Sequence, residues 1–264
     1  MGDSVTNSTK KGWLTAILEL GAWAGTLLSG ILAEMISRKY TILVNVFIFV
    51  IGVVIQTTAA AGGPQEILAG RFITGFGVGG LAMTCPLYCA EIAPAEVRGS
   101  LVALQQLAIT FGIMISFWID YGTNFIGGTG ETQSQASWLV PLSLQLIPAF
   151  TLGVGMLWMP FSPRWLIHHD REEEATAVLC SLRNLPIEHD LLKLELLEIK
   201  AQSLFEKRTE KEKFPHLERK TTWSYFVLEG KGLASLFTSW PMFRRVIVAT
   251  GQSKSPHAWQ FHNF

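Results

Sequence analysis

The sequence predicts an all-α integral membrane protein, and two observations carry this prediction. Charged residues make up only 16% of the 264 positions, whereas they make up about a quarter of an ordinary soluble domain. Long apolar stretches recur five times between positions 13 and 159, and each has the roughly 20 residues that a helix needs to cross a bilayer core about 30 Å thick. Buried helices of soluble proteins seldom recur at this length with so few charges, so we expect lipid around these helices.

The expected spans are separated by short polar links. Their approximate bounds are 13–35, 41–60, 67–90, 101–121 and 138–159. Small residues recur every four positions in the first span, at Gly21, Gly25, Ser29 and Ala33. Ridges of this kind let helix backbones approach closely in lipid, where packing rather than hydrophobicity drives helix association. We therefore expect closely packed helices.

Lysine and arginine are concentrated in alternate links, which sets the orientation because cytosolic links carry the excess of basic residues. The links 61–65 and 122–137 hold no basic residue and are expected outside. The other connections contain Arg38, Lys39, Arg98, Arg164 and Arg171. The segment after the fifth span is then cytosolic, and residues 1–12 form an external tail. Because Lys10 and Lys11 would not readily cross a membrane on their own, we expect a further helix upstream.

The pattern changes after the last span. Residues 162–241 are charged and amphipathic, which predicts a cytosolic helical linker domain. Asp170 and Glu173 fit a capping box at the start of a helix that ends before Pro186. Residues 242–264 begin as an apolar stretch but become polar too soon to span a membrane, so we expect an aborted helix and an atypical tail there.

Arg71 is the sharpest polar signal within the spans. It lies a few residues inside the third span, where an ionised side chain costs several kcal/mol unless it is paired or hydrated. Such residues often line a transport path, and snorkelling to the outer interface is the alternative. Glu19 lies at a similar distance from the outer side, so it is the expected acidic partner.

Glutamines form a second signal, at Gln105, Gln106 and Gln145. A side-chain amide both donates and accepts hydrogen bonds, which suits sugar hydroxyls in a water-lined cavity. Hydrogen bonding between helices is the alternative for Gln105 and Gln145.

A third signal is a set of charges at the cytosolic helix ends, namely Glu34, Arg38, Glu91, Arg98 and Arg164. Paired across helices, they would close the inner face and release it as the protein rocks. Unpaired, they would act only as topology determinants. The sequence contains no catalytic set and no metal-ligand spacing, so it predicts neither an enzyme nor a bound metal or other cofactor.

Four stretches in chain order carry a resemblance to a known family. They are residues 30–39 (GILAEMISRK), 86–99 (PLYCAEIAPAEVRG), 105–113 (QQLAITFGI) and 160–166 (PFSPRWL). Together they resemble the sugar porter family of the major facilitator superfamily, in its fungal proton-coupled branch. The chain departs from the family's pattern at Glu34, Met35, Ser37 and Phe161, where the family has an aspartate, a basic residue, a glycine and a glutamate.

The resemblance implies that the fold is an incomplete N-terminal half of the major facilitator fold, helices two to six, followed by an intracellular helical domain. Residues 242–264 then stand where the seventh helix would begin. Arg71 matches the arginine that works with an acidic residue of the first helix in proton-coupled members. Gln106 matches a sugar-binding glutamine, with Gln105 as its neighbour. The charges at the inner helix ends would gate the cytosolic face.

The resemblance further implies a multi-pass protein of the plasma membrane, of which this chain is a fragment. The full form would carry a hexose or related sugar by alternating access, together with a proton. A quinate or polyol permease is one alternative. A non-transporting membrane sensor, or an interaction fragment that associates with other transporter chains, is another. No nucleic acid partner is expected.

Overall fold

The computed structural model describes residues 2–62, 64–94, 96–126 and 134–213, with short pieces at 240, 243–244 and 247–248. The chain divides into two compact units, Met1–Phe205 and Glu206–Phe264. The described residues form the helices α1 (Gly2–Met35), α2 (Arg38–Gly62), α3 (Pro64–Ile92), α4 (Arg98–Thr123), α5 (Ala136–Leu144), α6 (Leu146–Trp158), α7 (Pro163–His168), α8 (Glu172–Arg183) and α9 (Asp190–Lys213). The predicted aborted helix and tail at 242–264 lie almost entirely outside the described residues.

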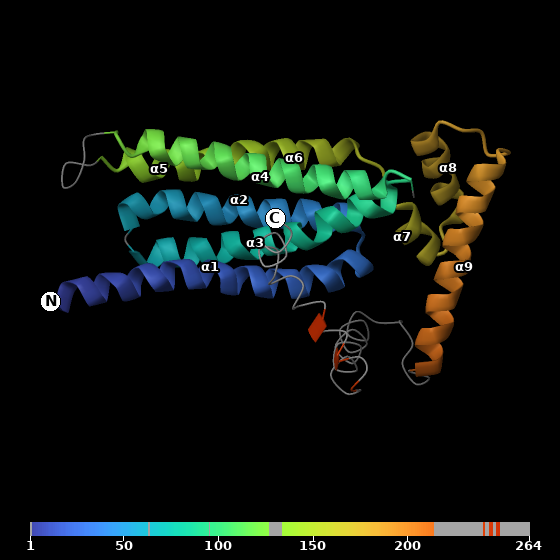
Figure 1. Ribbon diagram of the computed structural model, residues 1–264, viewed down its shortest axis with the longest axis horizontal. Coiled ribbons are helices and arrows are strands. Elements are labelled where there is room, and N and C mark those ends of the chain that lie inside the picture. The colour runs from blue at the N-terminus through green and yellow to red at the C-terminus, as the bar shows by residue number, and fades with distance from the viewer. Residues whose placement is uncertain are drawn as a thin grey trace, which may run out of the picture. The chain divides into compact units, whose positions relative to one another are not determined.

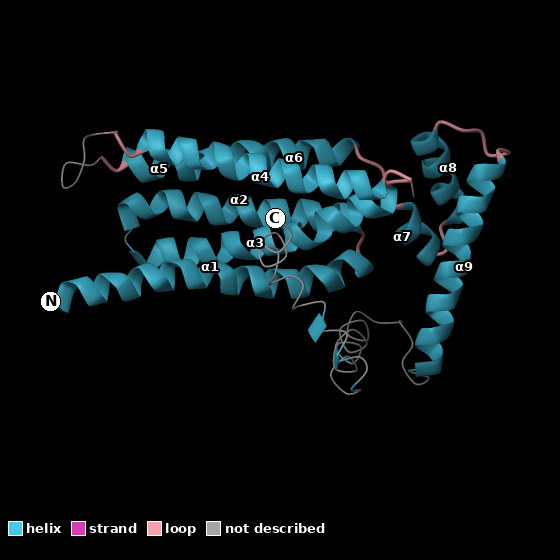
Figure 2. Ribbon diagram, in the orientation of Figure 1, coloured by secondary structure: helices cyan, strands magenta, loops and turns pink. Residues whose placement is uncertain are grey.

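The predicted all-α membrane fold is confirmed. Regular structure in the described ranges is helical (Figure 2). Five segments are long and apolar enough to cross a membrane, namely Gly12–Met35, Arg38–Thr58, Gln65–Ile92, Arg98–Thr123 and Ala136–Trp158. The first helix begins at Gly2, so it also runs through residues for which the sequence predicted a tail.

The fifth span is two helices rather than one, because α5 ends at Leu144 and α6 begins at Leu146. Pro148 explains this break. It has no N–H to donate to the carbonyl oxygen of Leu144, four residues earlier, and its ring crowds that carbonyl.

Helices α1, α2 and α3 lie side by side and pack closely (Figure 1). A Cβ atom added at Gly25 of α1 would lie 2.0 Å from the carbonyl oxygen of Phe76, and one at Gly79 of α3 would lie 2.0 Å from that of Ala22. Only glycine permits this approach. The predicted small-residue ridge therefore forms the contact between α1 and α3.

Buried polar contacts join the same three helices. The Asn45 amide of α2 donates to Ser29 Oγ of α1 at 3.0 Å. Gln56 of α2 hydrogen-bonds Thr74 of α3. Because an unpaired amide in hydrocarbon costs several kcal/mol, these pairs fix the register of α2 against its neighbours.

Helices α7, α8 and α9 pack around their own apolar cluster at the end of the bundle where α1 finishes and α2 starts (Figure 1). The cluster consists of Trp165, Leu166, Ile167, Ala175, Leu179, Leu192 and Ile199. The predicted capping box is wrong: α8 begins at Glu172 after Arg171, which makes no side-chain cap hydrogen bond. Asp170 adopts a left-handed backbone with φ 61°, which places it in the turn before the helix. The helix ends at Arg183 and is followed by Asn184, whose φ of 53° is that of a left-handed C-cap, two residues before Pro186.

Candidate functional site

Arg38 joins three helices at the end of the bundle that the sequence predicts to face the cytosol. Its Nη1 lies 3.0 Å from Glu34 Oε2 at the end of α1, and its Nε lies 3.0 Å from Glu91 Oε1 near the end of α3. The Arg38 and Glu91 side chains are only 12% and 7% exposed. Charge-assisted hydrogen bonds of this kind are strong, and guanidinium geometry suits two carboxylates at once. We call Glu34, Arg38 and Glu91 the inner charge network.

The connection between α6 and α7 is tied to the same region. Ser162 Oγ donates to Glu91 Oε2 at 2.5 Å, and the Tyr88 hydroxyl donates to the Pro160 carbonyl oxygen at 2.6 Å. Glu91 therefore accepts from Arg38 with one oxygen and from Ser162 with the other.

Helix α7 contacts Glu34 in two ways. The Trp165 indole N–H donates to the Glu34 carbonyl oxygen at 2.9 Å. His168 Nε2 lies 3.5 Å from Glu34 Oε1. Both the backbone and the carboxylate of Glu34 thus link the end of α1 to α7.

Arg98 and Arg164, the two other charges of the predicted set, do not join this network within the described part of the chain. Neither forms an ion pair with a described carboxylate, and the buried Nε of Arg98 has no hydrogen-bond partner there. The sequence pattern missed Tyr88, Ser162 and Trp165. Their positions in the sequence could have identified them. Tyr88 lies one turn before Glu91, and Ser162 and Trp165 lie on either side of Arg164 in the motif PFSPRWL.

Arg71 lies apart from the inner charge network. Its Nη1 donates to the Leu14 carbonyl oxygen of α1 at 3.2 Å. The expected pair with Glu19 is wrong: Glu19 is exposed and forms no ion pair with Arg71. Glu19 stands five residues further along α1 than Leu14, a rise of about 7.5 Å. The guanidinium therefore donates to a backbone carbonyl at a different level of the helix.

Gln105 and Gln106 lie on α4, which is exposed along most of its length. Gln106 is exposed, and Gln105 is half-buried with its Oε1 atom buried and unpaired in the described residues. No hydrogen bond brings either amide to Arg71 or to the inner charge network. The sequence-predicted residues therefore occupy separate places rather than one assembled solute site.

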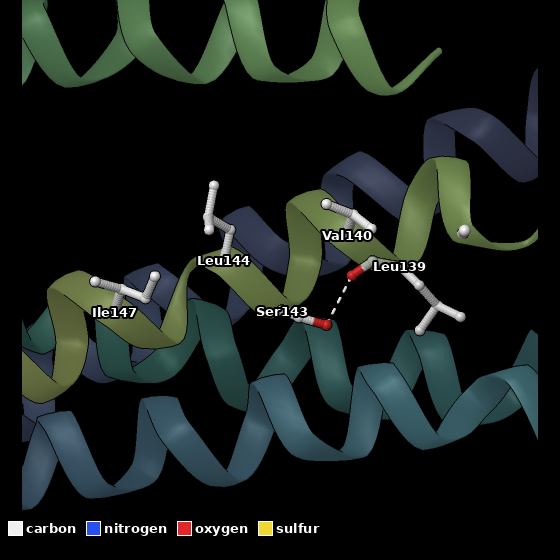
Figure 3. Close-up of a pocket in the computed structure, with 6 residues that line it drawn as sticks. Leu139, Val140, Ser143, Leu144 and Ile147 are labelled. Carbon is white, nitrogen blue, oxygen red and sulfur yellow. Dashed lines mark hydrogen bonds between the residues drawn. The ribbon is translucent and has the colours of Figure 1, made fainter. Parts of the chain in front are cut away.

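A pocket of about 400 Å³ runs along α5 and the start of α6 (Figure 3). It is lined by Ala136, Leu139, Val140, Ser143, Leu144 and Ile147. Its single side-chain hydroxyl, Ser143 Oγ, donates to the Leu139 carbonyl oxygen at 2.8 Å (Figure 3). A sugar or quinate needs several donors and acceptors, so this apolar lining does not suit either solute.

Comparison with known proteins places this geometry in a family. Residues 2–252 match the family model described as sugar (and other) transporter. The quinate permease of Neurospora africana is 38% identical over 174 residues, which cover 65% of this chain and 32% of that protein. The high-affinity glucose transporter of Kluyveromyces lactis is 32% identical over 217 residues, which cover 82% of this chain and 38% of the other.

Comparison with solved structures also points to a transporter fold. The proton:xylose symporter XylE of the major facilitator superfamily, with bound 6-bromo-6-deoxy-D-glucose, superposes with a TM-score of 0.68 at 25% identity. The match covers 79% of this chain and 46% of XylE. The chain spans about a third of the length of the curated relatives it matches. The resemblance read from the four motifs is thereby confirmed, and the chain belongs to the sugar (and other) transporter family.

Proposed function

We propose that the full-length protein carries a hexose, a related sugar or a polyol across the membrane by alternating access, with a proton as the coupled ion. The observation that carries this proposal is the inner charge network, in which Arg38 bridges carboxylates from two other helices at the inner helix ends. Transporters that rock about a central site need contacts that hold one face closed and can be released. Arg98 and Arg164, which join no described ion pair, then act as topology determinants.

Substrate contact falls to Gln106, with Gln105 beside it. Both amides lie on α4, and Gln106 is exposed, so it is free to meet a solute. Arg71 is proposed to take part in proton coupling, and in the described part of the chain its guanidinium donates to the Leu14 carbonyl oxygen. If Arg71 left this carbonyl oxygen to pair with a carboxylate, the new pair would form only while the carboxylate is ionised. Protonation of the carboxylate would then release Arg71.

We further propose that the protein resides in the plasma membrane with α7, α8 and α9 in the cytosol. The basic residues of the inner links support this orientation. Cys180 of α8 provides the test, because an impermeant maleimide should label it in intact cells only after the membrane is opened. Labelling of intact cells at the same rate would reverse the orientation.

The transport experiment uses labelled glucose, xylose and quinate in transporter-null yeast. We expect no saturable uptake by the 264-residue chain alone, because it spans only part of a transporter. A chimera in which residues 12–213 replace the matching segment of the Kluyveromyces lactis glucose transporter should take up glucose. In that chimera, Gln106→Ala should raise the half-saturation concentration about tenfold, as expected for a lost hydrogen bond to a ligand, while Gln145→Ala should change it little.

Three results would overturn parts of this proposal. Equal uptake by the chimera with and without Gln106 would remove that residue from the solute site. Uptake of quinate in preference to sugars would favour the permease alternative, which the 38% identity to a quinate permease supports. Copurification of the chain with an intact porter, without uptake, would instead favour an interaction role.

A further inference from the structure

Phe161 lies in the connection between α6 and α7, where the resembling family motif has a glutamate. Its ring meets two other aromatic rings. Tyr40 of α2 approaches edge-on with ring centroids 5.5 Å apart, and Trp165 of α7 stacks with centroids 6.2 Å apart. The ring therefore bridges the start of α2 and the start of α7.

Two cations lie near the same ring. Lys39 Nζ is 5.3 Å from the ring centroid, and Arg171 Cζ is 6.0 Å from it. Both distances are within the range in which a cation is attracted to the negative face of an aromatic ring. Lys39 comes from α2 and Arg171 from the turn after α7, so the contacts reach both sides of the connection.

The position of Lys39 is fixed independently. Its Nζ donates to the carbonyl oxygens of Leu157 at 2.9 Å and Met159 at 2.7 Å. These carbonyls end α6, where the helix dipole favours a positive charge. The ammonium is thus held at the end of α6 and beside the Phe161 ring at once.

Among the described residues, neither cation pairs with a carboxylate from across the connection. In the described ranges Lys39 forms no ion pair, and Arg171 pairs only with Glu174 of its own segment, at 2.6 Å. Lys39 contacts the Phe161 ring and the carbonyl oxygens of Leu157 and Met159. The ring carries no net charge. Dissolved salt therefore screens the attraction between Lys39 and the ring less than it would screen an ion pair.

We propose that Phe161 is a positioning residue that docks α7, and with it the intracellular helices, on the start of α2 through cation–π contacts with Lys39 and Arg171. This contact is therefore less sensitive to salt than an ion pair at the same place would be. This inference concerns the joint between the bundle and the intracellular helices and does not depend on which solute is carried.

Hydrogen exchange of the α7 amides tests the proposal in the purified full chain in nanodiscs, read by mass spectrometry. We expect Phe161→Leu, which keeps apolar bulk but removes the ring, to raise the exchange rate about fivefold, a factor equal to about 1 kcal/mol. Phe161→Tyr keeps the ring and should exchange like the wild type. Phe150→Leu, a ring-to-leucine change at an exposed position of α6, is the matched control and should have no effect.

Salt separates the proposed contact from simple packing. Wild-type exchange should change little between about 0.05 M and 0.5 M sodium chloride, whereas Phe161→Glu should exchange clearly faster at the higher salt because its new ion pairs would be screened. Lys39→Gln should exchange the α7 amides faster than the wild type does. The same substitution should have a smaller effect on this rate when Phe161→Leu is already present. Equal exchange in Phe161→Leu and wild type, or a wild type as salt-sensitive as Phe161→Glu, would overturn the proposal.

Discussion

The guanidinium of Arg183 in α8 lies 3.0 Å from the carbonyl oxygen of Ile92, the last residue of α3. The same guanidinium forms two hydrogen bonds with the Glu195 carboxylate of α9, at 3.0 Å and 2.6 Å. One side chain therefore ties helices α8 and α9 to the end of a membrane helix. The carbonyl groups that end a helix have no partner within it, so Arg183 also caps α3.

Arg183→Met is expected to destabilise the protein by about 2 kcal/mol, because it leaves the Glu195 carboxylate and the Ile92 carbonyl without their donor. The Arg183 side chain is 13% exposed and that of Glu195 is 31% exposed, so water replaces the lost bonds only partly. Glu174→Gln is the control, because its pair with Arg171 is exposed and worth less than about 1 kcal/mol, and the substitution leaves Arg171 beside Phe161. Thermal unfolding in detergent measures both. Equal melting temperatures for the two variants would contradict the role of Arg183.

Gly25→Ala is expected to separate α1 from α3. The new methyl group would lie 2.0 Å from the Phe76 carbonyl oxygen, and backbone cannot move aside as a side chain can. Overpacking of this kind costs about 1–3 kcal/mol. Gly112→Ala on α4 is the matched control, since nothing lies within 4 Å of its added Cβ atom. The melting temperature in detergent should fall for Gly25→Ala and stay level for Gly112→Ala; a fall in both would point to a general intolerance of alanine instead.

The sequence predicted the spans well because their signal is local. Each needs only about 20 consecutive apolar residues, and the segment 38–58 satisfies this without reference to any other part of the chain. The division of the fifth span was missed, although Pro148 is visible in the sequence, because a proline can bend a membrane helix as well as break it. The start of α8 was missed because a capping box is a pattern of residue types, and the left-handed backbone at Asp170 cannot be read from it.

The candidate site was less predictable because it depends on contacts between distant positions. Arg38 and Glu91 were both singled out, but their pairing across 53 positions follows from how α2 and α3 pack. Similar depth in the membrane suggested Glu19 as the partner of Arg71, but the guanidinium donates to the backbone carbonyl oxygen of Leu14. Every residue has a backbone carbonyl, so the residue types in the sequence could not indicate this contact. Phe161 was noted only as a departure from a family pattern, and its cation contacts emerged from the fold.

Ser37→Gly is expected to stabilise the protein. Ser37 joins α1 to α2 with φ 143°, a conformation that favours glycine, and strain of this kind costs about 1–3 kcal/mol. The substitution loses only a 3.4 Å hydrogen bond from the Tyr40 N–H to Ser37 Oγ. A net gain of about 1 kcal/mol would raise the melting temperature by roughly 3 °C in a chain of this size. Ser37→Ala removes the same hydroxyl and retains the strained backbone, so it should not stabilise; a rise in that variant would assign the effect to the hydroxyl.

Arg38→Met is expected to cost more than any other single change in the inner charge network. It leaves the carboxylates of Glu34 and Glu91 without their shared cation, and Glu91 is only 7% exposed. Breaking a buried ion pair costs about 3–5 kcal/mol, and the partial exposure of Glu34 lowers this to about 2–3 kcal/mol. Arg38→Lys keeps the charge but replaces the planar fork with a compact ammonium, so it should lie between wild type and Arg38→Met.

The pairing can be isolated by a second substitution, because Glu91→Gln removes the uncompensated charge that Arg38→Met leaves behind. The double variant should therefore melt at a higher temperature than Arg38→Met alone, although Glu91→Gln by itself lowers the melting temperature. Additive losses in the double variant would show that Arg38 and Glu91 act independently. In that case the 3.0 Å contact could not be what holds the start of α2 to the end of α3.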